Sequence, residues 1–314
     1  MNAIVYDRHA SPMPLVFQAV ENPVPKANEV LIQIHAVSIN AADYRSMKMG
    51  ISPKRKIFGA DVSGIVVALG PDCHTFAIGD EVFGDLAGCG FGGFAEFAVA
   101  PESLLARKPS AIGFVEAAAL PMASVTALQG LRDLGKLQPG QNVLIYGAGG
   151  GVGTFAVQLA KVFGARVTAV CSGKNSDRVR ALGADEVLDY DGTDFAKTGA
   201  RYDLILAVNG HHSLATYRRC LKPEGKLIVV GGDLRQVLGA LLFGPFLSIG
   251  RKKCRTLAAK PSGTDLAYIA KLVEDGRIHP VLDRQYALPD TVEAMNYLSQ
   301  GHAQGKVVIT VTGN

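Results

Sequence analysis

The chain has 314 residues, of which 48% are hydrophobic and 19% are charged, a composition typical of a well-packed folded protein rather than a disordered one. Its length favours two domains over one. The formal net charge of +4 is too small to indicate a nucleic-acid-binding protein without a concentrated basic patch. The five cysteines are scattered and contain no Cys-x-x-Cys pair, which argues against a disulfide framework and against structural zinc.

The sequence predicts neither a membrane span nor a secretory signal. Residues 1–7 alternate as a strand would and lack an apolar signal core. The longest apolar run, residues 239–250, is too short to cross a bilayer and contains Pro245. Together with the unpaired cysteines, these features lead us to expect a cytoplasmic protein.

The first 110 residues predict a β-rich domain. Short apolar segments recur between Gly and Pro turn signals, as in a partly closed barrel. The expected strands are residues 3–6, 29–37, 62–69, 81–84 and 95–99.

The periodicity changes after residue 114. Residues 116–120 and 124–134 predict helices separated by Pro121, and alternating strands and helices then continue to about residue 230. Repeated β-α-β units of this kind form a parallel, doubly wound sheet. The expected strands of this sheet are residues 143–146, 166–170, 186–188, 202–208 and 226–230, with a helix at 213–220. Two further helices, at 266–275 and 292–300, and a strand at 306–311 complete the chain.

A glycine cluster lies between the apolar run 143–146 and a helical pattern that begins near Gly151. Strand, tight turn and helix in this order are the setting in which a Gly-x-Gly-x-x-Gly fingerprint binds a dinucleotide. Ala148, Gly150 and Gly153 take its three glycine places. The helix would direct free N–H groups and the positive end of its dipole at the phosphates. The segment assigned to the phosphates is Ala148, Gly149, Gly150, Gly151, Val152 and Gly153.

The residues after the second strand of this unit indicate which cofactor is bound. About twenty residues past the fingerprint, where an acid would bind the ribose of NADH, the sequence has Cys171 and Ser172. Lys174, Asn175 and Arg178 follow. A hydroxyl, an amide and cations bind a 2′-phosphate, whereas a carboxylate would repel it. The sequence therefore predicts NADPH rather than NADH.

Two further strand ends should line the cofactor, because ligands of doubly wound sheets bind at the carboxyl ends of the strands. The residues concerned are Val208, Asn209, Val230, Gly231 and Gly232. Asn209 has an alternative interpretation, because loop asparagines commonly form turns.

Motifs along the whole chain resemble those of zinc-independent medium-chain dehydrogenase/reductases of the quinone oxidoreductase type. Their order and spacing carry the resemblance more than any single motif. The matching stretches are SINAADYR (38–45), GADVSG (59–64), GDEV (79–82), GGFAE (92–96), PMASVTA (121–127), YGAGGGVG (146–153), LGADEVLDY (182–190) and GKVV (305–308).

The resemblance implies an α/β protein in which a Rossmann domain is inserted into a GroES-like, partly closed β-barrel catalytic domain. The implied boundaries are 1–119 and 257–314 for the catalytic domain and 120–256 for the NADPH-binding domain. It also implies that Asn40 and Thr126 lie beside the nicotinamide in an interdomain cleft, that Tyr190 and Lys306 contact the cofactor, and that the protein is a homodimer joined through the cofactor domains.

No zinc site is expected, because a catalytic zinc needs three converging Cys, His or acidic ligands. Zinc-dependent members of the family place ligands near the positions of Ala41, Ala60 and 122–124, where this sequence has Ala, Ala and Met-Ala-Ser. The adjacent pair His211 and His212 is better explained as part of a loop, because neighbouring side chains point apart.

Without metal, the expected reaction is hydride transfer from NADPH to a carbon that is already electron-poor, in a quinone or an α,β-unsaturated carbonyl compound. Asn40 could donate an amide hydrogen to the substrate oxygen. Tyr44 could supply the proton, directly or through water, or could be a wall residue with solvent as the acid. Asp61 is expected to be structural.

Two alternatives keep the fold and change the function. One is a nucleotide-binding regulator or an RNA-binding relative with little turnover, suggested by the basic run at residues 251–255 behind the apolar segment 238–249. A solvated strand edge next to the dimer interface is the simpler explanation of that run, and no nucleic-acid partner is expected. The other is a zinc-free alcohol dehydrogenase, which would lack a group to stabilise an alkoxide.

Overall fold

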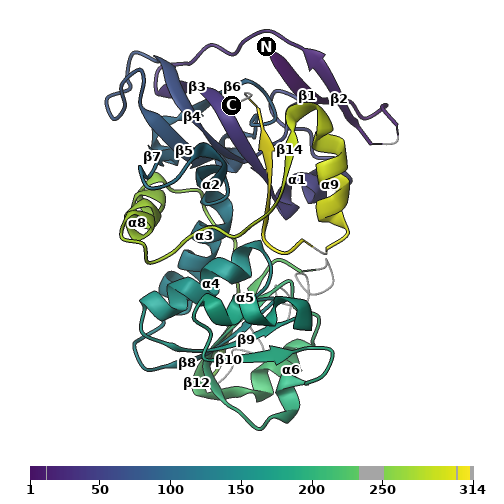
Figure 1. The fold of residues 1–314 in the computed structure, drawn as a ribbon, viewed down its shortest axis with the longest axis vertical. Helices are drawn as coiled ribbons and strands as arrows, with labels where there is room; N and C mark the ends of the chain where they lie inside the picture. The colour runs from purple at the N-terminus through teal and green to yellow at the C-terminus, as the bar shows by residue number, and fades with distance from the viewer. Residues whose placement is uncertain (12, 233–250, 302, 312–314) are drawn as a thin grey trace. The chain divides into compact units, whose positions relative to one another are not determined.

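The computed structural model describes residues 1–11, 13–232, 251–301 and 303–311. The backbone divides into two units, Met1–Val125 together with Lys260–Asn314, and Thr126–Ala259. The first unit therefore contains both ends of the chain (Figure 1). The divisions lie after Val125 and after Ala259, whereas the proposed domain boundaries lie after residues 119 and 256.

The first unit is built on a mostly antiparallel sheet with the order β14-β15-β3-β4-β5-β7, in which β6 also pairs with β3. Its central strand, β3 (Glu29–Ile39), pairs with β4 along one edge and with β6 and then β15 along the other. Two register shifts, at Leu31/Ile32 and at Ile34/Ala36, interrupt its pairing with β4. Such irregularities bend a strand and increase its twist, which suits the partly closed GroES-like barrel that the sequence predicts. The other strands are β4 (Asp61–Leu69), β5 (Glu81–Asp85), β6 (Phe97–Pro101), β7 (Leu105–Arg107), β14 (Leu282–Ala287) and β15 (Lys306–Thr310).

A two-stranded antiparallel sheet, β1 (Asn2–Tyr6) and β2 (Leu15–Ala19), and several helices complete this unit. Helix α8 packs on β7, and α9 packs on β14 and β15 (Figure 1). The apolar core includes Ile32 and Ile34 of β3, Phe58 and Phe94. The helices are α1 (Ala41–Lys48), α2 (Phe114–Ala118), α8 (Gly263–Glu274) and α9 (Thr291–Ser299).

The second unit contains a six-stranded, fully parallel sheet with the order β10-β9-β8-β11-β12-β13. The order reverses between β8 and β11, as in a doubly wound sheet, and this confirms the predicted fold class. The strands are β8 (Asn142–Tyr146), β9 (Arg166–Cys171), β10 (Glu186–Asp189), β11 (Tyr202–Val208), β12 (Leu221–Val230) and β13 (Lys253–Thr256). The helices are α4 (Gly151–Val162), α5 (Ser176–Ala181) and α6 (Leu214–Arg219).

One expected helix differs from the structure. The segment predicted as a helix at 124–134 is α3 (Pro121–Leu128) followed by a π-helical turn, η3 (Gln129–Leu134). Pro121 starts α3, because the first turn of a helix needs no proline N–H and its fixed φ suits that position. The chain division after Val125 falls within this helix.

No described helix could cross a membrane; each is too short or too polar. The apolar segments 238–249 and 239–250 named above lie within residues 233–250, outside the described ranges.

Candidate functional site

The turn after β8 has the geometry of a dinucleotide-binding loop. Gly147 has φ +76°, and the N–H groups of Gly147 and Ala148 both donate to the Val170 carbonyl at 3.0 Å. The chain then reaches Gly150, the extended N-cap of α4. The turn is thus made at Gly147, one position before Ala148, which by spacing keeps the first place of the fingerprint. A Cβ on Gly147 would also lie 2.4 Å from the Val208 carbonyl oxygen, so glycine is needed there.

The glycines of this turn have different steric roles. A Cβ on Gly153 would lie 2.1 Å from the Gly147 carbonyl oxygen, whereas a Cβ on Gly150 would meet nothing closer than that oxygen at 3.7 Å. Gly153 is therefore required for the helix to pack closely on the turn. Gly150 instead leaves open space beside N–H groups that have no partner within the helix. That combination fits a pyrophosphate, which must approach the backbone closely.

The end of β9 carries the residues expected to contact a 2′-phosphate. Asn175, which is buried, donates from Nδ2 to Ser172 Oγ at 2.9 Å and accepts from the Arg178 guanidinium on Oδ1. A Cβ on Gly149 would lie 2.6 Å from the same Nδ2. Asn175 thus braces the glycine turn from inside, while Ser172 keeps its hydroxyl hydrogen to donate and Lys174 is exposed.

An acid that the sequence analysis did not consider lies nearby. A Cβ on Gly173 would lie 2.6 Å from Oδ2 of Asp189, the last residue of β10. β10 is the neighbour of β9 in the sheet, so the carboxylate faces the segment assigned to the 2′-phosphate. Only the alternation of strands along the chain could have indicated it.

The other expected cofactor residues of this unit lie at strand ends. Val208 and Val230 end β11 and β12, and the half-exposed Tyr190 follows β10. Asn209 has φ +47°, and its Oδ1 accepts from Gly232 N–H at 3.0 Å, so it forms a turn that ties the two strand ends together. Gly231 and Gly232 also have positive φ. Thr126 is buried in α3 at the start of this unit.

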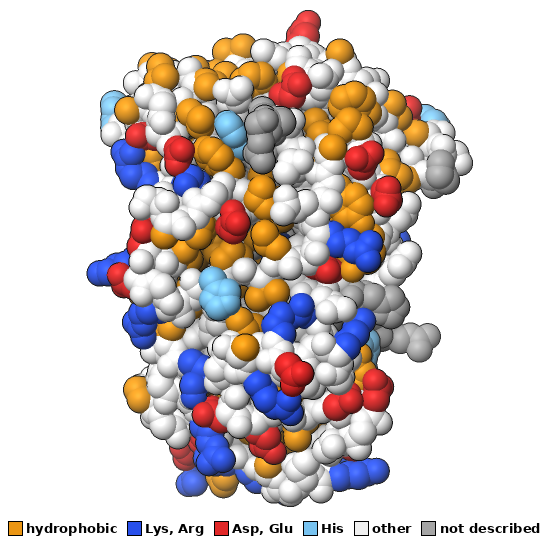
Figure 2. Space-filling view, viewed as in Figure 1, with side chains coloured by type: hydrophobic (Ala, Val, Ile, Leu, Met, Phe, Trp, Pro, Cys, Tyr) orange, Lys and Arg blue, Asp and Glu red, His pale blue; other side chains and the backbone are white. Residues whose placement is uncertain are grey.

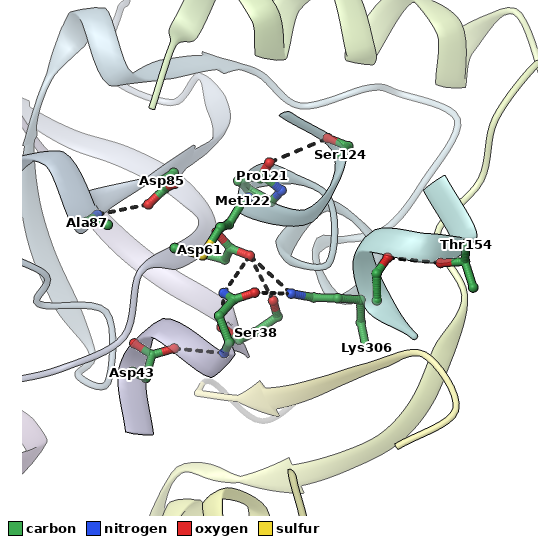
Figure 3. A network of polar contacts seen from close by, with 12 residues as sticks. Ser38, Asp43, Asp61, Asp85, Ala87, Pro121, Met122, Ser124, Thr154 and Lys306 are labelled. Atoms are coloured by element: carbon green, nitrogen blue, oxygen red, sulfur yellow. Dashed lines mark hydrogen bonds and ion pairs between the residues drawn. The ribbon is translucent and has the colours of Figure 1, made fainter. Parts of the chain in front are cut away.

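The first unit contains a buried polar cluster centred on Asp61, the first residue of β4 (Figure 3). Its Oδ2 accepts from Ser38 Oγ at 3.1 Å, Asn40 Nδ2 at 2.8 Å and Lys306 Nζ at 3.3 Å. Its Oδ1 accepts from the Met122 N–H at 2.9 Å. Asp61 is fully buried, and four hydrogen bonds offset the cost of removing a carboxylate from water.

Lys306 supplies the positive charge of this cluster. Its Nζ donates to Asn40 Oδ1 at 2.6 Å as well as to Asp61, and the residue is only 3% exposed. The residue before it has to be glycine, because a Cβ on Gly305 would lie 2.4 Å from the Val281 carbonyl oxygen. The structure therefore brings together Asn40 and Lys306, two residues predicted separately and 266 positions apart.

Asn40 is fixed on every side. Its Oδ1 accepts from Lys306, and its Nδ2 donates to Asp61 and, at 3.4 Å, to the Ser38 carbonyl. The Asn40 N–H donates to Asp43 Oδ2 at 2.7 Å, and Gly59 N–H donates to Asp43 Oδ1 at 3.1 Å. This acid in the first turn stabilises the start of α1 and joins it to the segment before β4.

Two further acids, Asp43 and Asp85, are buried around Asp61. Asp85 lies directly opposite Asp61 in the β4–β5 pair and accepts from the Ala87 N–H at 2.8 Å. Burial, reinforced by the neighbouring Asp61 charge, raises the pKa of Asp85 to about 7, and burial likewise raises the pKa of Asp43 to about 7. Protonation of Asp43 and Asp85 would reduce the negative charge around the one lysine, Lys306.

Tyr44 lies on α1, one position after Asp43, and packs partly against the apolar core. Arg45 Cζ and Lys48 Nζ lie 5.8 and 5.5 Å from the centre of its ring, within the range of a cation–π interaction.

Residues 26–110 match the model of the alcohol dehydrogenase GroES-like domain, and residues 182–309 match that of the zinc-binding dehydrogenases. A chloroplast envelope quinone oxidoreductase homolog of Arabidopsis thaliana is 36% identical over 302 residues, which cover 91% of each chain. The chain belongs to the quinone oxidoreductases of the medium-chain dehydrogenase/reductase family. It is accordingly an oxidoreductase that uses a nicotinamide cofactor.

Further relatives support this assignment. A 2-methylene-furan-3-one reductase of Solanum lycopersicum is 33% identical over 301 residues, covering 91% of this chain and 73% of that one. The solved structure of the quinone oxidoreductase from Coxiella burnetii has a TM-score of 0.89 and 30% identity, with 99% of each chain covered.

The residues at the family's zinc positions do not suit a zinc ion. Ala41 and Ala60 have no donor atoms, and the third stretch, residues 122–124, has no Cys, His or acidic side chain. The nearby cluster already contains the ammonium of Lys306, which would repel a cation. Across the described ranges, no three His, Cys, Asp or Glu side chains come together in a way that could hold a metal ion.

The sequence predicts only a structural role for Asp61, and it does not single out Asp43 or Asp85. A signal was present, because Asp61 and Asp85 each adjoin an apolar strand segment, where an acid is unusual unless it is paired.

Proposed function

We propose that this oxidoreductase reduces quinones or α,β-unsaturated carbonyl compounds with NADPH and without a metal ion. The observation that carries the NADPH part is the end of β9, where the Ser172 hydroxyl and the exposed Lys174 adjoin the brace of the glycine turn. A hydroxyl and an ammonium at this place favour a 2′-phosphate. The names of the relatives, a quinone oxidoreductase and a methylene-furanone reductase, support the substrate class.

The residues that would hold the phosphates and ribose of the cofactor lie in the second unit. The open space at Gly150 and the start of α4 would receive the pyrophosphate, and the strand ends at Val208 and Val230 would line the rest. When bound, NADPH supplies a hydride. Asp189 would disfavour a doubly charged phosphate beside Gly173, so Lys174 has to outweigh this repulsion for NADPH to be preferred.

In the first unit, we assign Asn40 and Lys306 to a single role. Hydride addition to a quinone or enone leaves negative charge on the carbonyl oxygen, and a nearby donor lowers the energy of that charge. Lys306 polarises the Asn40 amide through its 2.6 Å bond to Oδ1, which makes the Nδ2 hydrogens better donors. The second Nδ2 hydrogen, whose only acceptor is the Ser38 carbonyl at 3.4 Å, is the one left to bond a substrate oxygen. Tyr44, or water beside it, then delivers the proton.

The remaining elements of the proposal are a homodimer and a cytoplasmic location. The homodimer rests on family resemblance, and the location on five cysteines with no disulfide among them.

Steady-state assays with a panel of quinones, cyclic enones, alkenals and alcohols, each with NADPH and with NADH, test the proposal. After prolonged chelation, we expect NADPH-dependent turnover of quinones or enones and no oxidation of alcohols. A strict zinc requirement would overturn the proposal of a metal-free reaction, and a preference for NADH would overturn the proposal of NADPH as the cofactor. Cofactor binding without turnover on any substrate would favour the nucleotide-binding regulator instead.

A further inference from the structure

A hollow lined by cations lies at the β13 edge of the parallel sheet, among residues that the proposed function does not use. It measures about 420 Å³, including space open to solvent. The lining comes from the end of η3, from β12 and from β13, all within the second unit. It consists of Leu134, Lys136, Lys226, Ile228, Lys253 and Arg255, four of which are cationic and none acidic.

The strand register places like charges side by side. β12 and β13 are parallel neighbours in which Lys226 pairs with Lys253 and Ile228 pairs with Arg255. Alternate residues of a strand point to the same face, so Lys253 and Arg255 lie on the face of the sheet that carries Lys226. Like charges directly opposite one another destabilise a strand pair. An anion between the two strands would relieve this repulsion.

Two lysines of the lining lie in energetically unfavourable surroundings. Lys226 Nζ donates to the Gly135 carbonyl at 2.6 Å, and burial together with the charges of Lys136 and Arg255 lowers its pKa. Lys136 has φ +49°, a left-handed conformation that a residue with a side chain adopts only at a cost. Within the described ranges, Lys136, Lys226 and Arg255 make no ion pair with an acid.

We propose that this hollow binds a small multivalent anion of the phosphate class, such as a pyrophosphate group. Ammonium and guanidinium groups around one hollow match several phosphate oxygens at once. The apolar floor of Leu134 and Ile228 lowers the local dielectric and strengthens those contacts. A single-stranded nucleic acid fits less well, because the lining has no aromatic residue on which a base could stack.

Calorimetric titration of the full chain with inorganic pyrophosphate at low ionic strength tests the proposal. We expect a saturable site whose affinity falls about tenfold or more in Arg255→Gln, as loss of a charge-assisted hydrogen bond implies. Lys136→Gly should weaken binding similarly while the protein stays folded, because glycine accepts the left-handed backbone at residue 136. Arg166→Gln, which removes an exposed cation at the other end of the sheet, is the matched control and should leave the affinity unchanged.

The same titration separates the competing sites. If Lys174→Gln abolishes pyrophosphate binding and Arg255→Gln does not, the anion sits at the glycine turn and the proposal is wrong. It is equally wrong if no saturable binding occurs, or if single-stranded RNA binds more tightly than pyrophosphate and loses its affinity in Arg255→Gln.

Discussion

The polar cluster of the first unit and the glycine turn of the second are built in opposite ways. In the cluster, side chains satisfy one another: Asp61, Asn40 and Lys306 are each at most 8% exposed and are joined by hydrogen bonds of 2.6–3.3 Å. In the turn, the backbone carries the geometry, through the positive φ of Gly147 and the close approach at Gly153. One region is therefore sensitive to lost charge and the other to added volume.

The largest effect should come from Lys306→Met, which keeps the shape of the side chain and leaves Asp61 buried without its cation. Removing one partner of a buried ion pair costs about 3–5 kcal/mol, and we expect a loss of this size in the free energy of unfolding, measured by chemical denaturation. The double variant Lys306→Met/Asp61→Asn should recover part of the loss, because it removes the uncompensated charge. Wild-type stability in Lys306→Met would show that the pair is not coupled.

The glycine turn should separate stability from binding. In Gly153→Val the new side chain would overlap the Gly147 carbonyl, so we expect a large loss of stability. Gly150→Val meets no such overlap; we expect it to fold and to lose on the order of 100-fold in cofactor affinity, about 2.7 kcal/mol. Circular dichroism checks the fold, and NADPH fluorescence measures binding. Normal affinity in a folded Gly150→Val would place the cofactor elsewhere.

Tyr44→Phe tests whether the first unit supplies the proton. If the phenol is the general acid, turnover should fall by roughly a hundredfold with quinones and enones alike, while the dissociation constant for NADPH stays the same. A small loss that differs between substrates would make Tyr44 a wall residue and leave water as the proton source.

A further effect concerns the pH dependence of stability. The pKa of Asp85 is raised to about 7 by burial, from an ordinary value of 3.8. The folded protein therefore holds a proton that the unfolded chain releases, so this contribution is fully present below pH 4 and is lost as the pH rises through 7. We expect Asp85→Asn to gain stability relative to wild type between pH 4 and pH 8, in denaturation curves recorded at each pH. A constant difference would mean that Asp85 is already ionised at pH 4.

The elements that could be predicted from the sequence are those formed by residues close together in the chain, as in the glycine turn; the polar cluster joins residues that are far apart. Strand β11 (Tyr202–Val208) matches its prediction because a buried parallel strand is a continuous apolar run, and α4 follows a glycine turn that is local in sequence. The bond from Lys306 to Asn40 joins residues 266 positions apart, so only the folded sheet reveals it. The position of Asp189 beside Gly173 likewise depends on the pairing of β9 with β10, and no local pattern encodes that.

The preference for the 2′-phosphate is tested most directly by titrating NADPH and NADH into the wild-type protein, Lys174→Ala and the matched control Arg166→Ala. Because Lys174 has to outweigh Asp189, its loss should weaken NADPH binding by about 1.5–3 kcal/mol, the value of a charge-assisted hydrogen bond, and leave NADH nearly unchanged. Arg166→Ala should behave as wild type with both cofactors. Tighter binding of NADH than of NADPH by the wild-type protein, or an equal loss for both in Lys174→Ala, would contradict the proposal.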